Sequence, residues 1–280
     1  MTPFRVLCAG LLAVSGALAS AQERVSFPSL DGAGNAPVVL TGYFFAAASS
    51  APARTVVLLH GCGGMHDRSG ALTRRFGDYA ALFNGLGVHA LVVDSLTPRY
   101  EKEICTQRIG KRRVTQANRR LDALGAIAYL AGRSDVDAAR IGLVGWSNGG
   151  STVLAATNLR HRDVAAAAVK PAFAVAFYPG CEADLNRGYE PAAPLLLLVG
   201  EADDWTPAAP CRALARASAE PKPDLESYVG AFHGFDSDAP VRLRKDVPNG
   251  VNPVLGVHVG GNAAAYRMSR ERLLRFMGER

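Results

Sequence analysis

Short apolar runs alternate along the chain with segments that are apolar on one side only. Continuous runs of Val, Leu and Ala are typical of strands buried on both faces of a sheet, and apolar residues at helical spacing are typical of helices packed on it. We therefore expect strands at 38–46, 53–61, 88–95, 141–144, 172–180, 194–204 and 224–230. We expect helices at 72–86, 114–132, 148–159, 208–218 and 262–277, and a long polar loop at 96–113.

This alternation predicts the fold class. Strands that alternate with helices form a mostly parallel central sheet with helices on both faces, a three-layer α/β architecture. No repeat, low-complexity linker or compositional break divides residues 22–280, so we expect a single domain there. Ligands of such sheets bind beyond the carboxyl ends of the strands, so functional residues are expected at those ends.

Residues 1–21 have the pattern of a secretory signal peptide. One positive charge, Arg5, precedes an apolar run from Val6 to Leu18, and the small residues Ala19-Ser20-Ala21 follow it. This layout predicts cleavage after Ala21 and export to the periplasm or the medium, with no stable membrane insertion afterwards. The alternative interpretation is an N-terminal anchor helix that is not cleaved.

The composition and the distribution of charge indicate which kinds of partner the protein could bind. The chain has 280 residues, 49% of them hydrophobic, and a net charge of +6. Apart from a local cluster at 108–113, the positive residues are scattered, whereas a nucleic-acid interface concentrates basic residues with interleaved aromatics. We therefore expect no nucleic-acid partner, and the sequence leaves the oligomeric state open.

Four cysteines remain after the predicted cleavage, and an even number in an exported protein indicates disulfides. Four cysteines allow three pairings. We favour Cys181–Cys211, which flank one predicted strand, and Cys62–Cys105, which follow two different strands. Since no Cys and His residues are clustered at metal-ligand spacing, we expect no structural metal.

The sequence Gly145-Trp146-Ser147-Asn148-Gly149 lies between a predicted strand and a predicted helix. A serine at a sharp strand-to-helix turn needs small residues two positions away on either side, and Gly145 and Gly149 meet that need. The following helix points free amide groups and its positive dipole end at the serine. Ser147 is therefore the candidate nucleophile, and the alternative is an ordinary tight turn.

A catalytic serine needs a histidine base and an acid that orients it. Asp203 follows the apolar run "LLLLV" (195–199) by a short turn and is the candidate acid, with Asp204 and then Glu201 as alternatives. His233 lies in a glycine-containing loop after the last predicted strand and is the candidate base, with His258 as the alternative.

A glycine-rich loop, His60-Gly61-Cys62-Gly63-Gly64, begins at the end of the strand predicted at 53–61. Such a loop turns backbone N–H groups toward a substrate carbonyl, whose developing negative charge needs two donors. We assign these donors to the amides of Asn148 and Cys62, with Gly63 as a substitute for Cys62. The alternatives are a plain turn and a thiol nucleophile at Cys62, although export favours a disulfide over a free thiol.

With these residues assembled, the chain resembles the α/β-hydrolase superfamily and, within it, the dienelactone hydrolase family. The resemblance rests on "VVLLHGCGG", "VVDSLTPR", "RIGLVGWSNGG", "LLLLVGEADDWTP" and "FHGFD", in that order. It implies hydrolysis of an ester or lactone through an acyl-enzyme on Ser147, with His233 as base, Asp203 as its orienting acid, and no cofactor or metal. The chain departs from the family in its serine nucleophile, where cysteine is typical, and in its predicted export.

Four further residues are candidates for the substrate pocket: Arg99, Tyr100, Trp146 and Trp205. Arg99 could bind a substrate carboxylate, and the alternative is an ordinary surface arginine. The expected substrate is a small or polymer-derived ester. The competing functions are an exported peptidase on the same fold and a binding protein that keeps the hydrolase shape without activity.

Overall fold

An eight-stranded sheet forms the centre of the computed structural model, which describes residues 22–32 and 37–279. The order of its strands is β1-β2-β4-β3-β5-β6-β7-β8. Their bounds are β1 (Gln22–Pro28), β2 (Val39–Phe45), β3 (Ala53–Leu59), β4 (His89–Asp94), β5 (Val136–Trp146), β6 (Phe173–Phe177), β7 (Leu195–Gly200) and β8 (Asp224–Tyr228). Strand β2 runs antiparallel to both β1 and β4, and all other pairs are parallel, which confirms the mostly parallel sheet. The predicted signal segment, 1–21, lies outside the described residues.

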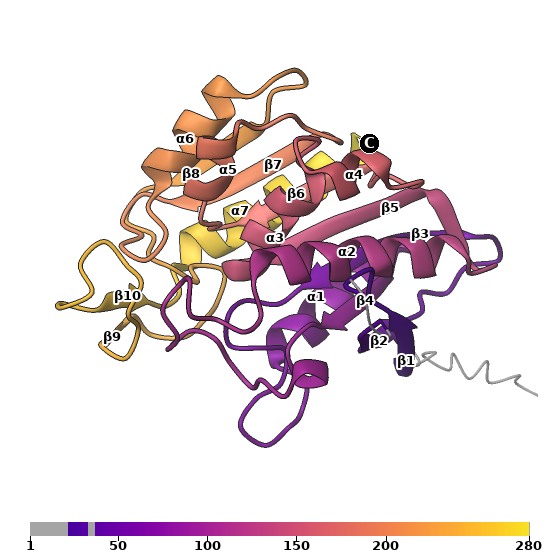
Figure 1. Ribbon diagram of the computed structural model, residues 1–280, viewed down its shortest axis with the longest axis horizontal. Coiled ribbons are helices and arrows are strands. Elements are labelled where there is room, and N and C mark those ends of the chain that lie inside the picture. The colour runs from indigo at the N-terminus through magenta and orange to yellow at the C-terminus, as the bar shows by residue number, and fades with distance from the viewer. Residues whose placement is uncertain (1–21, 33–36, 280) are drawn as a thin grey trace, which may run out of the picture.

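Helices cover both faces of this sheet (Figure 1). The longer helices are α1 (Arg74–Asn84), α2 (Gln116–Ala131), α3 (Asn148–Thr157), α6 (Ala208–Ala217) and α7 (Ala263–Gly278), and the short ones are α4 (Arg162–Ala166), α5 (Glu182–Arg187) and the 3-10 turn η1 (Thr97–Arg99). One apolar cluster joins the sheet to α1 and α7, and another joins its opposite face to α2, α3 and α6. The three-layer α/β architecture is therefore confirmed.

The two clusters explain why the central strands are continuously apolar. Val56 and Leu58 of β3 belong to the cluster under α1 and α7, whereas Val57 and Leu59 belong to the cluster under α2 and α3. Successive side chains of a strand point to opposite faces, so a strand covered on both faces has no position left for a solvent-facing residue. All four side chains are fully buried.

Several elements were not expected from the sequence. Strand β1 is an edge strand in which Val25 and Phe27 are buried and their neighbours exposed, so its signal is a brief alternation. The helices α4 and α5 are too short to show a helical period. A small hairpin of β9 (Arg242–Arg244) and β10 (Val257–Val259) lies in a polar segment without an apolar run.

A third apolar cluster lies at the carboxyl ends of the strands and ties three loops together. It contains Cys62, Leu96, Ile104, Cys105, Val114, Val247 and Val257. These residues come from the glycine-rich loop after β3, from the long loop at 96–114 and from the β9–β10 segment. The loops therefore form a packed rim at the edge where a site is expected.

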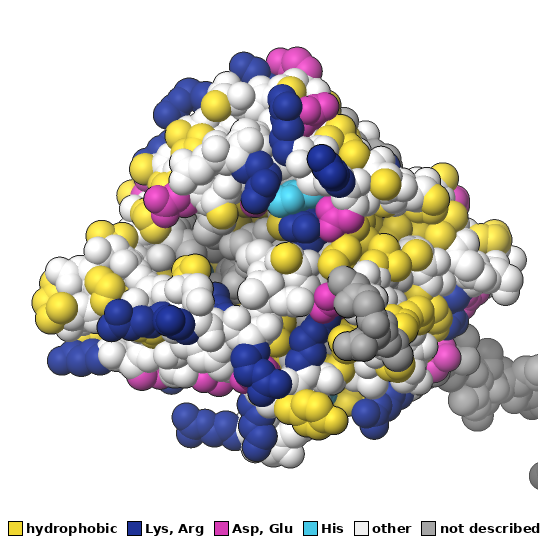
Figure 2. All heavy atoms as spheres, viewed as in Figure 1, with side chains coloured by type: hydrophobic (Ala, Val, Ile, Leu, Met, Phe, Trp, Pro, Cys, Tyr) yellow, Lys and Arg dark blue, Asp and Glu magenta, His cyan; other side chains and the backbone are white. Residues whose placement is uncertain are grey.

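The two expected disulfides are present in the structure: Cys62–Cys105 and Cys181–Cys211. Figure 2 shows Lys and Arg side chains distributed over the visible face, with acidic side chains between them. Within residues 22–32 and 37–279, no helix is both long enough and apolar enough to cross a membrane.

Candidate active site

Ser147 occupies a strained turn between β5 and α3. Its backbone angles are φ 56° and ψ −119°, a region that residues other than glycine rarely adopt. The turn is closed by its glycines: a Cβ on Gly145 would lie 2.2 Å from the carbonyl oxygen of Gly149, and a Cβ on Gly149 would lie 2.0 Å from that of Leu59. Any larger residue at these two positions would therefore separate α3 from β3 and β5.

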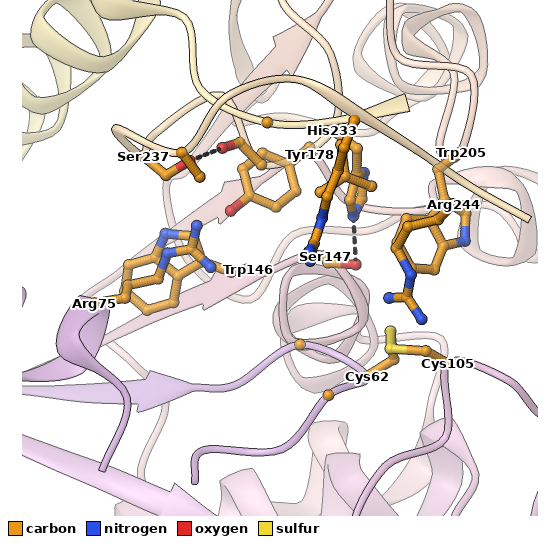
Figure 3. A pocket seen from close by; sticks show the side chains of 17 residues that line it. Cys62, Arg75, Cys105, Trp146, Ser147, Tyr178, Trp205, His233, Ser237 and Arg244 are labelled. Atoms are coloured by element: carbon orange, nitrogen blue, oxygen red, sulfur yellow. Dashed lines mark hydrogen bonds between the residues drawn. A yellow bond between two sulfur atoms is a disulfide. The ribbon is translucent and has the colours of Figure 1, made fainter. Parts of the chain in front are cut away.

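A chain of hydrogen bonds joins Ser147 to His233 and Asp203 (Figure 3). His233 Nε2 is 2.8 Å from Ser147 Oγ, and His233 Nδ1 is 2.8 Å from Asp203 Oδ2. The other carboxylate oxygen of Asp203 accepts the backbone N–H groups of Trp205 and Thr206, both at 2.8 Å. These bonds fix the carboxylate after β7, and both His233 and Asp203 are only 4% exposed.

The alternative acid and base form a second pair. Asp204 Oδ2 is 2.7 Å from His258 Nδ1, and Asp204 Oδ1 accepts the backbone N–H of His258 at 2.8 Å. Because the Asp204 carbonyl also accepts the N–H of Val251, this residue anchors the β9–β10 segment. Glu201, the third candidate acid, forms an exposed ion pair with Arg212. The structure thus places Asp203, rather than Asp204 or Glu201, against His233.

The glycine-rich loop after β3 lies directly against the serine. A Cβ on Gly61 would lie 3.5 Å from Ser147 Cβ, and both Gly61 and Cys62 line the pocket around Ser147. Among the described residues, neither the Cys62 amide nor the Asn148 amide has a hydrogen-bond acceptor. The Cys62 carbonyl accepts the N–H of Ile104 at 2.8 Å, and its sulfur is bonded to Cys105. Cys62 is therefore no free thiol, which rules out the thiol-nucleophile alternative.

The pocket that contains Ser147 has a volume of about 210 Å³. Its walls come from the glycine-rich loop, the turn at Ser147, the loops after β6 to β8 and the β9–β10 segment. Trp205 lines it as expected, and its ring centroid is 4.7 Å from that of His233. Trp146 also borders it but is only 1% exposed, because its ring packs into the aromatic core between Tyr79 and Phe177.

Two predicted pocket residues are not among those that line it. Both guanidinium NH groups of Arg99 donate to Asp122, at 2.9 and 2.8 Å, and one of them also reaches Asp31 at 2.9 Å. Arg99 thus ties the 3-10 turn to α2, and its donors are already used. Tyr100 is 90% exposed. The assignment of both residues to the substrate pocket was wrong, since carboxylates hold the Arg99 side chain, solvent surrounds that of Tyr100, and neither residue lines the pocket.

Instead, three other arginines line the pocket: Arg75, Arg242 and Arg244. The Arg244 guanidinium lies 5.4 Å from the ring centroid of Trp205 and also pairs with Asp246. The described lining contains no acidic residue. This group could not be recognised from the sequence, because α1 and the β9–β10 segment are distant in the chain and only the fold brings them together.

A buried carboxylate behind the site was also missed. Asp236 accepts hydrogen bonds from Trp146 Nε1 at 2.7 Å, from Tyr178 at 2.6 Å and from Tyr79 at 3.1 Å, and it pairs with Arg75 at 3.0 Å. Burial raises the pKa of the Tyr178 hydroxyl well above its ordinary value, so this group stays protonated and donates to Asp236.

This carboxylate supports two residues next to Ser147 and His233. Trp146 precedes Ser147, and the Tyr178 ring packs edge-on against His233 with centroids 4.7 Å apart. The available signal was the position of Asp236, three residues after His233 at the end of "FHGFD". In the part of the chain that the structure describes, no group of three or more His, Cys, Asp or Glu side chains is placed to hold a metal ion.

Comparison with known proteins agrees with this geometry. The model of the dienelactone hydrolase family matches residues 40–280. A search of curated proteins found no match for the chain.

Three similar solved structures share the fold. The dienelactone hydrolase-like promiscuous phosphotriesterase P91, from metagenomic libraries, is 18% identical with a TM-score of 0.64, over 92% of this chain and 98% of its own. A thermophilic esterase of Thermogutta terrifontis is 19% identical with a TM-score of 0.62, over 93% and 92%. The dienelactone hydrolase of Anabaena variabilis is 20% identical with a TM-score of 0.58, over 76% and 88%. The chain belongs to the dienelactone hydrolase family and is a carboxylic ester hydrolase of the α/β-hydrolase superfamily.

Proposed function

We propose that this protein is an exported serine hydrolase that cleaves carboxylic ester or lactone bonds through Ser147, His233 and Asp203. The observation that carries the proposal is the unbroken hydrogen-bond chain between these residues, which begins at a strained turn inside a pocket. A serine, a base and an orienting acid within hydrogen-bond reach of one another form the arrangement that nucleophilic acyl transfer requires.

In the proposed mechanism, Ser147 Oγ attacks the substrate carbonyl carbon while its proton passes to His233 Nε2. Asp203 holds Nδ1–H of the ring, so Nε2 is the nitrogen free to accept that proton, and it stabilises the imidazolium that forms. When the C–O bond of the leaving group breaks, His233 returns the proton to the departing oxygen. A water molecule then attacks the acyl-enzyme with the same proton transfers, releasing the acid and restoring Ser147.

The negative charge on the substrate oxygen needs two donors close to Ser147. The amides of Cys62 and Asn148 flank the serine, and neither has an acceptor among the described residues. We assign both amides to the oxyanion hole, because preformed backbone donors stabilise developing charge without rearrangement during the reaction. This assignment also gives the glycine-rich loop its function.

The pocket limits the substrate in size and charge. Its volume of about 210 Å³ is below the roughly 300–1,000 Å³ of pockets for drug-sized ligands, which favours short acyl groups over long ones. Asp236 and Asp246 pair with two of the three lining arginines, Arg75 and Arg244, from outside the pocket. Because no carboxylate belongs to the described lining itself, an ester that is neutral or negatively charged is favoured over a cationic one. An extended peptide has less support, and a peptidase is therefore the second candidate.

Export is supported by the N-terminal sequence and by the two disulfides, which persist in oxidising compartments. Cell fractionation of a strain that expresses the full chain tests it. We expect the protein in the periplasm or the medium, with Gln22 as its first residue. A full-length protein in the membrane fraction would instead indicate an anchor.

The activity is tested with nitrophenyl esters of increasing acyl length, together with a serine-directed organophosphonate. A related esterase from T. terrifontis has been observed phosphorylated by paraoxon, so the choice of reagent suits this fold. We expect turnover of acetate and butyrate esters and labelling of Ser147 alone, both abolished in Ser147→Ala. A protein that neither turns over esters nor takes the label would favour the non-catalytic alternative.

A further inference from the structure

A buried arginine lies behind the proposed oxyanion hole and has no assigned function. Arg119 belongs to α2, and its side chain is fully buried. One guanidinium nitrogen donates to Asn148 Oδ1 at 2.5 Å, and the other donates to the carbonyl of His60 at 2.7 Å. Asn148 and His60 belong to the two loops that carry the proposed oxyanion donors, so Arg119 bridges these loops.

The chemical surroundings of Arg119 are unusual for a buried cation. Within the described residues no carboxylate forms a salt bridge with its guanidinium, and its hydrogen bonds go to neutral acceptors. Burial lowers its pKa to about 10, an effect that Asp122 and Asp94 partly offset, so the group is charged at neutral pH. Burying a charge without a paired carboxylate is costly, and such a cost is more often found where the charge has a function.

Hydrogen bonds join Arg119 to Asn148, which carries one proposed oxyanion donor, and to His60, two residues before Cys62, which carries the other. Arg119 holds the backbone carbonyl of His60 at 2.7 Å, and its contact with His60 Nδ1 at 3.4 Å is no hydrogen bond, because that nitrogen carries a proton. A carbonyl only accepts, so His60 Nδ1–H donates to the carbonyl of Gly61, at 2.7 Å. This carbonyl belongs to the same planar peptide as the N–H of Cys62, so its bond to His60 fixes the direction of that donor. On the other side, Asn148 is held by Arg119 at its side chain and by Gln116 of α2 at its carbonyl, at 3.1 Å.

We propose that Arg119 is a positioning residue that keeps the two oxyanion donors, the amides of Cys62 and Asn148, at a fixed separation. Its positive charge additionally favours the negative charge that develops between them. This inference rests on the proposed function, since it requires the oxyanion hole assigned above. It differs from a purely structural role because the oxyanion exists only in the transition state and the tetrahedral intermediate, and loss of Arg119 therefore affects kcat more than KM.

The main test compares Arg119→Met with the wild-type protein, using nitrophenyl acetate. Removal of one complete oxyanion donor lowers kcat by about 100- to 1,000-fold. Arg119→Met displaces both donors but removes neither, so we expect a smaller fall in kcat, of about 10- to 100-fold. KM should stay within about twofold, because the substrate carbonyl is uncharged. Affinity for an aryl trifluoromethyl ketone, which forms a hemiketal oxyanion on the serine, should fall in parallel with kcat, and Arg119→Lys should restore part of both.

Arg99→Met is the matched control. Arg99 also packs against α2 and is mostly buried, but it binds Asp122 and Asp31 and does not line the pocket. We expect this variant to melt at a lower temperature while its kcat changes by less than about threefold. A folded Arg119→Met protein with wild-type kcat would overturn the inference, and so would an equal fall of kcat in both variants.

Asn148→Ala provides a second route if Arg119→Met does not fold. This variant removes the Oδ1 acceptor but keeps the backbone amide, so kcat should fall while ketone binding weakens. In the double variant with Arg119→Lys, the two effects should not be additive, because they break one interaction. Unchanged kcat in Asn148→Ala would contradict the inference. Wild-type protein without turnover or labelling at Ser147 would instead refute the proposed function itself.

Discussion

The Cys62–Cys105 disulfide should support catalysis as well as stability. It joins the loop that carries a proposed oxyanion donor to the long loop at 96–114, within the third apolar cluster. We expect that replacing both cysteines by alanine lowers kcat as well as the melting temperature. The Cys181–Cys211 disulfide, which lies in the core beside α5 and α6, offers a matched comparison within the same chain.

The expected loss of stability is nearly equal for the two disulfides. Their sequence separations are 43 and 30 residues. The loop-entropy relation then gives about 4 kcal/mol for the first and about 3.7 kcal/mol for the second. For a domain of this size, such losses lower the melting temperature by about 8–16 °C. A difference in activity between the two variants therefore cannot come from a difference in global stability.

The assay measures kcat and KM for nitrophenyl acetate at 20 °C, well below both melting temperatures, together with circular dichroism melts. Without the Cys62–Cys105 bond, the glycine-rich loop after β3 keeps the hydrogen bond between Cys62 and Ile104 but loses its covalent link to the loop at 96–114. We expect kcat to fall about tenfold or more, a part of the loss for a complete donor. The variant without Cys181–Cys211 should keep its kcat. Equal kcat values in the two variants would refute the reasoning.

Three further changes test separate parts of the site. Asp203→Asn should lower kcat by about 10⁴-fold, because the carboxylate that holds His233 in the required tautomer is lost. Asp204→Asn should lower kcat far less. If steady-state kinetics show the larger loss in Asp204→Asn, the orienting acid is Asp204. Burial lowers the pKa of His60 well below 6.5, so the unfolded chain binds more protons and stability should fall as pH drops below about 6.5. Thermal melts from pH 5 to 8 should show a smaller slope in His60→Asn, and an unchanged slope would exclude His60 as the cause. Gly149→Ala, whose Cβ would lie 2.0 Å from a carbonyl of β3, should give a protein without labelling at Ser147, and normal labelling would show that the turn tolerates a side chain.

The central sheet and the candidate triad residues could be located from sequence for a common physical reason. A strand covered on both faces must be apolar throughout, and a polar residue directly after such a strand therefore stands out. Ser147, Asp203 and the glycine-rich loop all follow buried strands in this way. Their mutual distances were not predictable, and the choice between Asp203 and Asp204 depended on a turn in which adjacent carboxylates point to different histidines.

The pocket walls were predicted less well, because they are made by loops without a periodic pattern. Arg99 follows β4 at a strand end, which suggested the site, but the carboxylates of Asp31 and Asp122 draw its side chain toward α2. The arginines that do line the pocket include two on β9, whose three residues are too few to show strand alternation. Charge pairing with distant segments thus decided the position of Arg99, and a single sequence does not reveal such pairs.

The buried polar residues behind the site were not predicted, because the identity of a polar residue does not indicate whether it is buried. Arg119 and Asp236 read as surface residues, and yet both are buried with several hydrogen bonds. Each contacts a direct neighbour of Ser147 in the chain: Arg119 bonds Asn148, and Asp236 bonds Trp146. The turn at Ser147 has a strained backbone that relaxes unless its neighbours hold it. A cation on one side and an anion on the other hold those neighbours, so buried charges that solvent does not reach maintain the backbone strain at Ser147.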